Sequence, residues 1–383
     1  MWGVTFPEPY MSLYNASARA LKAVDPSLQV GGPATMQTLD VAQFISNASA
    51  MRVPVDFVSS HYYPTDPQCQ SVATKGHIDC FADQVLAAQQ HAHMAGLPFW
   101  LTEYNNGLGS TSRDDSSAAA FVFRTVGLVQ ALDAFSWWTF SDVFEEGWLR
   151  SAPFHNGYGM MTVQGVRKPV WRAFEALAGA GTKRYPVAGV DPTSSVSVFA
   201  TDGGGGALGV QAYVANWHRV DAERFSCSKE SALCVKDPSG AFTDEALCNA
   251  DCHGSGEQPP LGRRASATVE QDATEEDVKF ERGRRSVGDG PKAQKVVVVV
   301  VTHAADAAVG TKARAVRIDA THANPQALWQ SWGSPQYINT AQEAALHAAA
   351  QVAPEWLPVT RLGATQSAVT LEMAEYSALH LVM

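Results

Sequence analysis

The stretch PFWLTEYNNG, from Pro98 to Gly107, contains an apolar run that rises to one glutamate, Glu103, and then breaks into Asn-Asn-Gly. A short apolar run bounded by turn residues indicates a buried β-strand. When such a strand belongs to a parallel sheet, a carboxylate at its end lies at the mouth of a site. Acid–base chemistry commonly pairs two carboxyl groups, so Glu103 raises two questions: which fold carries it, and where its partner lies.

Helices and strands alternate over the first half of the chain. Helical periodicity predicts helices over 10–24, 41–51, 81–96, 113–132 and 168–181. Apolar runs between them predict strands over 28–34, 55–64, 98–104 and 134–142. The first helix is expected to bury one face, made of Leu13, Ala16, Ala20 and Val24. The fourth helix is expected to be capped by Asp114 or Asp115, and the fifth has Pro169 in its first turn.

Apolar strands that alternate with helices are typical of an α/β protein with a parallel sheet. The four strand-helix units amount to half of a (β/α)8 barrel, and a small open sheet is the alternative. Polar and aromatic residues gather where the strands end, in HYYP, EYNN and SDVFEE. In a barrel, this end of the strands is the catalytic face.

The pattern changes after Gly181. The segment SVSVFATDGGGGALGVQAYVANW alternates like a hairpin with its turn at Gly203–Gly206, and KVVVVVVTHA and SAVTLEMAEYSALHLVM predict further strands. We therefore expect an all-β sandwich domain over residues 183–383. A cysteine-rich and flexible insertion is expected to interrupt it at about 221–292.

The 383-residue chain has 46% apolar and 17% charged residues, which is typical of a globular protein. Its formal net charge of -10 argues against nucleic acid or a membrane surface as a partner, and no apolar run is long enough to span a membrane. His91 and His93 are two apart on a predicted helix and cannot chelate together, and no phosphate loop is found. We expect no metal and no cofactor, and the sequence does not define an oligomeric state.

The six cysteines fall into two local groups. Cys69 and Cys80 bracket one loop, and the other four crowd one polar segment: Cys227, Cys234, Cys248 and Cys252. Disulfides are favoured over zinc, because this segment lacks paired C-x2-C spacing and encloses no histidine. Disulfides indicate a secreted or lysosomal/vacuolar protein, yet the N-terminus has no signal peptide, so we expect the true N-terminus to lie upstream of Met1.

Five motifs follow one another from about Tyr10 to Leu177: YMSLYNASARALKAVDPSLQVGGPAT, VDFVSSHYYP, LTEYNNG, WWTFSDVFEE and PFHNGYGMMTVQGVRKPVWRAFEAL. Together they resemble glycoside hydrolase family 39, which holds β-xylosidases and α-L-iduronidases. Further along, ARAVRIDATHANPQALWQSWGSPQYIN is similar to the iduronidase-type sandwich. The resemblance implies a retaining glycosidase on a (β/α)8 TIM barrel, with residues 1–182 forming its second half, strands five to eight.

The resemblance implies that Glu103 in LTEYN is the nucleophile, at the end of the seventh strand. An oxocarbenium-like transition state also needs a second carboxyl, roughly 5–5.5 Å from the nucleophile, to protonate the departing oxygen. The family carries this acid/base in an Asn-Glu-Pro motif, which has no match here. Glu8 in FPEPY is the nearest look-alike, but no apolar strand precedes it, and we interpret it as a loop glutamate. The acid/base is therefore expected to be absent from this chain.

The resemblance also implies substrate-binding roles for six residues: His61, Tyr63, Trp138, Glu145, Glu146 and His155. Taken alone, a histidine at a strand end is usually structural, an aromatic residue in a strand is usually core, and adjacent glutamates are usually solvated. In the family context, Tyr63 is expected to keep the Glu103 carboxylate ionised by a hydrogen bond, and Trp138 to form a platform for a sugar ring. Glu146 is slightly favoured over Glu145 as the acceptor of sugar hydroxyls.

The function predicted is a retaining O-glycosyl hydrolase that acts on terminal glycosidic bonds of a carbohydrate substrate. WWTFSDVFEE resembles the xylosidase branch more than the iduronidase branch, and no basic residue in the strand-end motifs is placed to hold a uronate. Without its acid/base, the isolated chain is expected to be inactive. The alternative is a degenerate, non-catalytic carbohydrate-binding relative.

Overall fold

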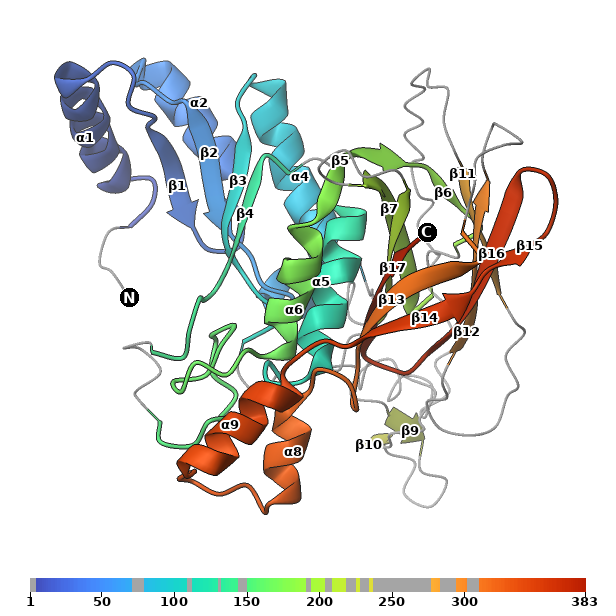
Figure 1. Ribbon diagram of the computed structural model, residues 1–383. Helices are drawn as coiled ribbons and strands as arrows, with labels where there is room; N and C mark the ends of the chain where they lie inside the picture. Colours follow the sequence, from blue (N-terminus) through green and yellow to red (C-terminus); the bar gives the residue numbers. More distant parts are fainter. Residues whose placement is uncertain are drawn as a thin grey trace.

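The structure is a computed structural model of the chain. It describes residues 5–70, 79–108, 112–129, 132–143, 150–190, 194–203, 209–217, 294–301 and 310–383. It also describes the backbone of three short strands, β9 (Phe225–Cys227), β10 (Cys234–Lys236) and β11 (Asp277–Arg282). Figure 1 shows two sheet regions with helices between them. Among the described residues, no helix is long and apolar enough to cross a membrane.

The first region is a four-stranded parallel sheet in the order β1-β2-β3-β4. Its strands are β1 (Gly31–Thr35), β2 (Phe57–His61), β3 (Phe99–Tyr104) and β4 (Ala134–Trp137). The helices are α1 (Tyr10–Val24), α2 (Val41–Met51), α3 (Pro67–Gln70), α4 (Cys80–Met94), α5 (Ser116–Leu128) and α6 (Pro169–Leu177). The predicted alternation of strands and helices is confirmed, and only the short α3 was not expected. Asp115 caps α5 by accepting a hydrogen bond from the Ser117 backbone.

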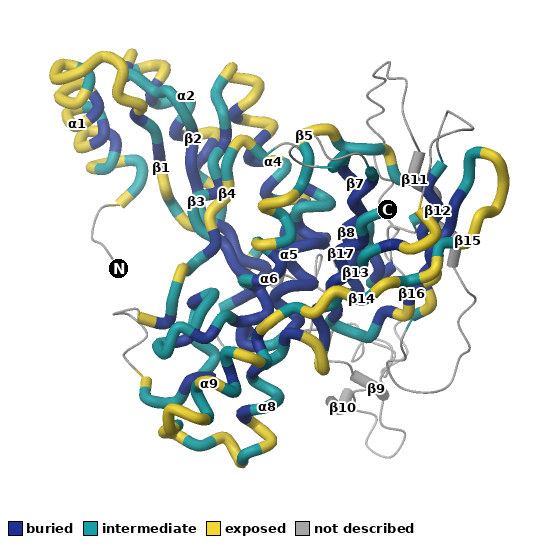
Figure 2. Tube along the Cα trace, viewed as in Figure 1, coloured by how far each residue is buried: buried dark blue, intermediate teal, exposed yellow. Residues whose placement is uncertain are grey.

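Helix α1 buries a different face from the one predicted. Its buried residues are Met11, Tyr14 and Ala18, because the aromatic ring of Tyr14 packs edge-on against Phe44 of α2 at a centroid distance of 5.0 Å. The predicted face is turned to solvent: Leu13 is 55% and Val24 83% exposed. Two further apolar side chains beside β1 are exposed as well, Met36 and Leu39. The outer side of α1 and the segment after β1 thus expose apolar side chains, and Figure 2 shows α1 largely in the exposed colour at the edge of the molecule.

The second region contains two mainly antiparallel sheets. One has the order β14-β13-β17-β8-β7-β5 and the other β15-β16-β12-β11-β6. Their strands are β5 (Ala180–Tyr185), β6 (Val187–Ala188), β7 (Val196–Gly203), β8 (Val210–Asn216), β12 (Gln294–Val301), β13 (Lys312–Ile318), β14 (Pro354–Pro358), β15 (Thr360–Arg361), β16 (Gln366–Met373) and β17 (Ser377–Val382). Valine, alanine and leucine side chains from both sheets form one buried cluster, as expected of a sandwich.

The predicted hairpin is confirmed, since β7 pairs antiparallel with β8. Two features differ from the sequence-based expectation. Helices α8 (Pro325–Ser331) and α9 (Thr340–Ala349) stand in a segment that had been assigned only to the sandwich. Strands β9, β10 and β11 fall inside the predicted flexible insertion, and β11 pairs antiparallel with β12 along its whole length, Asp277–Arg282. The predicted boundary at 182/183 lies within β5, which belongs to the sandwich sheet.

Helices α5 and α6 join the two regions. Figure 1 places them between the parallel sheet and the sandwich, and α5 packs against β7, β8 and β17. Phe123 of α5 meets Tyr213 of β8 at a ring-centroid distance of 5.3 Å, almost perpendicular. One hydrophobic cluster runs from α1 through the parallel sheet to Phe199 and Tyr213 of the sandwich. The sandwich therefore packs against α5, which lies next to β3, the strand that carries Glu103.

Candidate active site

Glu103 stands near the end of β3, opposite His61 at the end of β2. His61 Nδ1 lies 2.9 Å from Glu103 Oε2. The Tyr63 hydroxyl donates a hydrogen bond to the other carboxylate oxygen, Oε1. The side chain of Glu103 retains 18% exposure, whereas Tyr63 is buried. The parallel pairing of β2 and β3 thus brings three of the predicted site residues together.

The surroundings keep the Glu103 carboxylate ionised. Burial acts to raise the pKa of Glu103, but the hydrogen bonds from His61 and Tyr63 outweigh it, and the pKa is lowered overall. Burial and the neighbouring carboxylate raise the pKa of Tyr63, so that Tyr63 remains a protonated donor. Burial also raises the pKa of Asp66, which accepts a hydrogen bond from the Tyr63 backbone at 2.9 Å. An ionised, partly exposed carboxylate held by two donors is suited to attack an electrophilic carbon.

Trp138 follows the last residue of β4 and is half-buried. Its backbone N–H donates to the Tyr104 carbonyl at 2.9 Å, and its own carbonyl accepts from the Asn105 side chain at 3.1 Å. The Asn105 side chain also accepts from the Gly107 backbone at 2.7 Å. The Asn-Asn-Gly segment after Glu103 is therefore a hydrogen-bonded turn that links Trp138 to β3, the strand that carries Glu103.

The other predicted residues are less closely tied to Glu103. His155 hydrogen-bonds the Ala152 carbonyl at 3.0 Å, and no hydrogen bond joins it to Glu103, His61 or Tyr63 within the described chain. Glu145 and Glu146 lie outside the described residues. Glu8 is exposed before α1 and accepts a hydrogen bond from Ser12, which agrees with a loop role.

A buried lysine, Lys168, organises the loops around the site and was not predicted. Its Nζ lies 2.6 Å from Asp114 Oδ1 and 2.8 Å from Asp142 Oδ2, and it donates to the Gly157 carbonyl at 3.1 Å. Lys168 is 0% exposed. Asp142 also accepts from the Gly159 backbone, which passes so close that a side chain at Gly159 would lie 2.2 Å from the Asp142 nitrogen. The segments after β3 and β4 and the loop before α6 are thereby tied to one cation.

A buried arginine, Arg113, also links the segment after β3 to the loop before α6. Its guanidinium donates to the Gly107 carbonyl at 2.7 Å and to the Asn156 carbonyl at 2.8 Å, and it lies 4.4 Å from the Tyr158 ring centroid. Buried charges paired across distant segments leave no periodic signal, so neither Arg113 nor Lys168 was found from the sequence.

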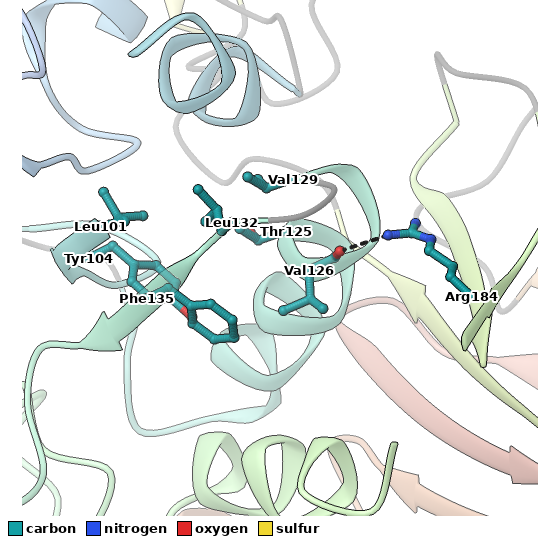
Figure 3. A pocket seen from close by; sticks show the side chains of 8 residues that line it. All are labelled: Leu101, Tyr104, Thr125, Val126, Val129, Leu132, Phe135 and Arg184. Atoms are coloured by element: carbon teal, nitrogen blue, oxygen red, sulfur yellow. Dashed lines mark hydrogen bonds between the residues drawn. The ribbon is translucent and has the colours of Figure 1, made fainter. Parts of the chain in front are cut away.

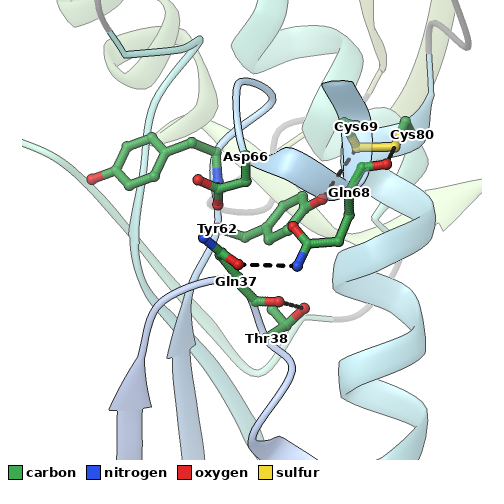
Figure 4. The surroundings of a disulfide bond; sticks show 8 residues. Gln37, Thr38, Tyr62, Asp66, Gln68, Cys69 and Cys80 are labelled. Carbon is green, nitrogen blue, oxygen red and sulfur yellow. Dashed lines mark hydrogen bonds between the residues drawn. A yellow bond between two sulfur atoms is a disulfide. The ribbon is translucent and has the colours of Figure 1, made fainter. Parts of the chain in front are cut away.

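The predicted disulfide in the loop after β2 is present. Cys69 of α3 is bonded to Cys80 of α4, and the Tyr62 hydroxyl lies 3.2 Å from the Cys69 sulfur (Figure 4). In the second cysteine group, the register of β9 and β10 sets Cys227 opposite Cys234. Cys248 and Cys252 lie outside the described residues.

Curated β-xylosidases resemble this chain in sequence. It is 33% identical over 214 residues to a β-xylosidase of Caldicellulosiruptor saccharolyticus, covering 52% of this chain and 42% of the relative. It is 35% identical over 195 residues to a β-xylosidase of Geobacillus stearothermophilus, covering 47% of this chain and 39% of the relative. The chain thus spans about two fifths of the length of these curated relatives.

Solved structures show the same fold. The structure of a family 39 β-xylosidase from Caulobacter crescentus matches with a TM-score of 0.60 at 22% identity, covering 98% of this chain and 61% of that one. A family 39 enzyme from Xanthomonas axonopodis pv. citri matches with a TM-score of 0.61 at 21% identity, covering 97% and 63%. The chain therefore shares its fold with TIM-barrel glycosidases that carry a sandwich domain, over about three fifths of their length. The model of the glycosyl hydrolases family 39 matches residues 2–235, and the chain belongs to this family.

Proposed function

We propose that Glu103 is the nucleophile of a retaining glycoside hydrolase that cleaves terminal xylosidic bonds. The observation that carries this proposal is the ionised Glu103 carboxylate, held by His61 and Tyr63 at the end of a parallel strand. The curated relatives that the chain resembles over about half its length are β-xylosidases. Within the described part of the chain, Glu103 is paired with His61 and Tyr63 and with no arginine or lysine that would favour a uronate.

In the proposed reaction, a Glu103 oxygen attacks the anomeric carbon while the bond to the departing oxygen breaks. A glycosyl ester forms on Glu103, and the departing oxygen takes its proton from a second carboxylic acid. Water then attacks the anomeric carbon and breaks its bond to the Glu103 oxygen, which frees the Glu103 carboxylate. The water gives its proton to the second carboxylate, and the sugar leaves with its original configuration. Tyr63 would keep the carboxylate oriented and deprotonated before the attack, and His61 would donate to its other oxygen.

We also propose that the parallel sheet is one half of a (β/α)8 barrel whose other half supplies the acid/base. Two observations support this. Both β1 and β4 are edge strands of the sheet described. The apolar surface formed by Leu13, Val24 and Met36 beside β1 is exposed, as expected where a neighbouring strand-helix unit would pack.

A covalent trapping experiment tests the nucleophile without requiring the acid/base. Dinitrophenyl 2-deoxy-2-fluoro-β-xyloside has a leaving group that departs without protonation, and the fluorine slows hydrolysis of the ester. Mass spectrometry of the treated protein should show one fluoroxylosyl group on the peptide that contains Glu103. Glu103→Gln should remain unlabelled, whereas Glu343→Gln, at a half-buried position of α9, should label normally.

Labelling at another residue, or none, would contradict the assignment of Glu103. Absence of labelling together with saturable xylose binding would instead indicate a non-catalytic carbohydrate-binding relative.

As a separate proposal, the protein works in a secreted or lysosomal/vacuolar compartment, which the Cys69–Cys80 disulfide supports. Fractionation of cells that carry the gene tests it, and recovery of the protein only from the cytosol would contradict it.

A further inference from the structure

A cavity of about 160 Å³ lies between the parallel sheet and α5, away from the Glu103 carboxylate. Figure 3 shows its lining side chains: Leu101, Tyr104, Thr125, Val126, Val129, Leu132, Phe135 and Arg184. Leu101 and Tyr104 of β3 both line the cavity because the β3–β4 register shifts between them, and Glu103 is not among the lining residues. The cavity therefore lies behind the candidate active site, on the helix-covered face of the sheet.

The size and the lining of the cavity suit a ligand with a single aromatic ring. Six of its eight lining residues present apolar or aromatic surface, and Phe135 is 40% exposed, which leaves the ring accessible from outside. An apolar protein cavity of about 150 Å³ is large enough to hold a benzene molecule. A polar sugar is a poor fit, because few polar groups line the cavity to replace its hydration.

Arg184 brings a positive charge to this cavity without a matching anion. Its guanidinium donates to the backbone carbonyls of Val126 and Gly127 and lies 5.4 Å from the centroid of the Phe199 ring, and no ion pair joins it to a carboxylate of the described residues. These two carbonyls leave several of its five N–H donors for another acceptor. Burial lowers the pKa of Arg184, which reflects the cost of holding this charge away from water. An anion beside Arg184 would offset that cost.

Tyr104 brings a buried hydroxyl that has no partner. Tyr104 is 1% exposed, and its hydroxyl makes no hydrogen bond within the described residues. A buried hydroxyl without a partner is costly, so native proteins usually satisfy it by a protein group, water or a ligand. In Figure 3, Tyr104 and Arg184 stand on opposite sides of the apolar lining. The cavity thus has a cationic group, Arg184, that could bind an anion on one side, and a hydroxyl group, Tyr104, that could hydrogen-bond a ligand on the other.

We propose that this cavity binds a small single-ring carboxylic acid, with its carboxylate on Arg184 and its ring among Leu101, Val126 and Phe135. A polar substituent opposite the carboxylate, such as a hydroxyl, pairs with the Tyr104 hydroxyl. The ligand class is therefore a hydroxy-substituted aromatic monocarboxylate. This inference does not depend on the proposed glycosidase activity.

Isothermal titration calorimetry of the full chain with four probes tests the ligand class. The expected order of affinity is 4-hydroxybenzoate, then benzoate, then benzyl alcohol, and acetate should give no saturable heat. Benzyl alcohol keeps the ring but not the charge, and acetate keeps the charge but not the ring. Equal affinity for benzoate and acetate would mean a surface anion effect and overturn the proposal, as would no saturable binding of either aromatic acid.

Three variants test the location. Arg184→Met should weaken benzoate binding roughly tenfold or more, since a hydrogen bond to a charged group is lost. Tyr104→Phe should make 4-hydroxybenzoate and benzoate bind equally. Val126→Phe should fill the cavity and abolish binding of both acids, and Arg361→Met, on an exposed edge strand, should leave binding unchanged.

Each variant also has an outcome against the proposal. Unchanged benzoate affinity in Arg184→Met would show that Arg184 does not bind the carboxylate. Retained binding in a folded Val126→Phe would show that the ligand binds outside this cavity. Because the Arg184 and Tyr104 variants delete polar groups without filling space, they remain informative even if Val126→Phe fails to fold.

Discussion

His61 Nδ1 lies 2.9 Å from Glu103 Oε2, and the two residues are direct register partners on the adjacent strands β2 and β3. The contact is thus built into the sheet and does not depend on a mobile loop. Tyr63, two residues further along, reaches the other oxygen of the same carboxylate. One strand end therefore supplies both hydrogen-bond donors that fix Glu103.

Removing the Tyr63 hydroxyl should raise the pKa of Glu103. Tyr63→Phe deletes a hydrogen bond that favours the ionised form, while burial, which disfavours it, remains. The acidic limb of the pH profile for fluoroxylosyl labelling should therefore move to higher pH, and labelling at mildly acidic pH should slow roughly tenfold. Tyr337→Phe removes a hydroxyl from a residue that is 73% exposed and should leave the profile unchanged. An unmoved acidic limb in Tyr63→Phe would show that Tyr63 does not set the ionisation of Glu103.

Replacing Lys168 should destabilise the fold strongly. Lys168→Met leaves the carboxylates of Asp114 and Asp142 buried without their cation, which costs about 3–5 kcal/mol in comparable cases. Urea unfolding monitored by fluorescence should show this loss in the free energy of unfolding. The triple variant Lys168→Met, Asp114→Asn, Asp142→Asn should recover much of it, because no buried charge remains unpaired. If the single and triple variants lose equal stability, the ion pairs are not the cause.

Much of the first region could be predicted because its signals are local. The apolar run before Glu103 and the cap at Asp115 are short sequence patterns, and both appear in the structure as expected. Helix α8 also has a local start signal, because Asn324 caps it and Pro325 follows, although its residues fall in the segment predicted to be sandwich. A capping box at Asn339 likewise marks the start of α9.

What could not be predicted depends on packing partners that lie far away in the sequence. The packing of Tyr14 against Phe44 determines which face of α1 is buried. Helical periodicity alone fits the face of Leu13 and Val24 equally well. Lys168 appears in a short basic pair before a proline, a pattern of exposed residues, until Asp114 and Asp142 are brought around it. The position of Glu103 at a strand end beside His61 and Tyr63 was predictable from the motifs, whereas the ion pairs of Lys168 were not.

Removing the Cys69–Cys80 disulfide should lower stability by roughly 2–3 kcal/mol, because the bond closes a short loop in the unfolded chain. The double variant Cys69→Ala, Cys80→Ala should unfold at lower urea concentration than the oxidised protein, and reductant should not shift it further if this is the only bond that matters. Unreduced protein should resist alkylation at both cysteines in peptide mapping. Alkylation of either one would contradict the bond.

Buried His380 should make the protein lose stability as the pH falls from about 6.5 to about 4. His380 stacks on Tyr213 at 4.7 Å and hydrogen-bonds Gln211 at 2.7 Å, and burial, together with the Arg314 charge, lowers its pKa to about 4. Over that window the unfolded chain binds a proton that the folded chain does not, so unfolding is favoured by up to on the order of 3 kcal/mol. His380→Gln cannot titrate, and carboxylates titrate equally in both proteins. The difference in unfolding free energy between wild type and His380→Gln should therefore change across this pH range, and a flat difference would mean that His380 titrates normally in the folded state.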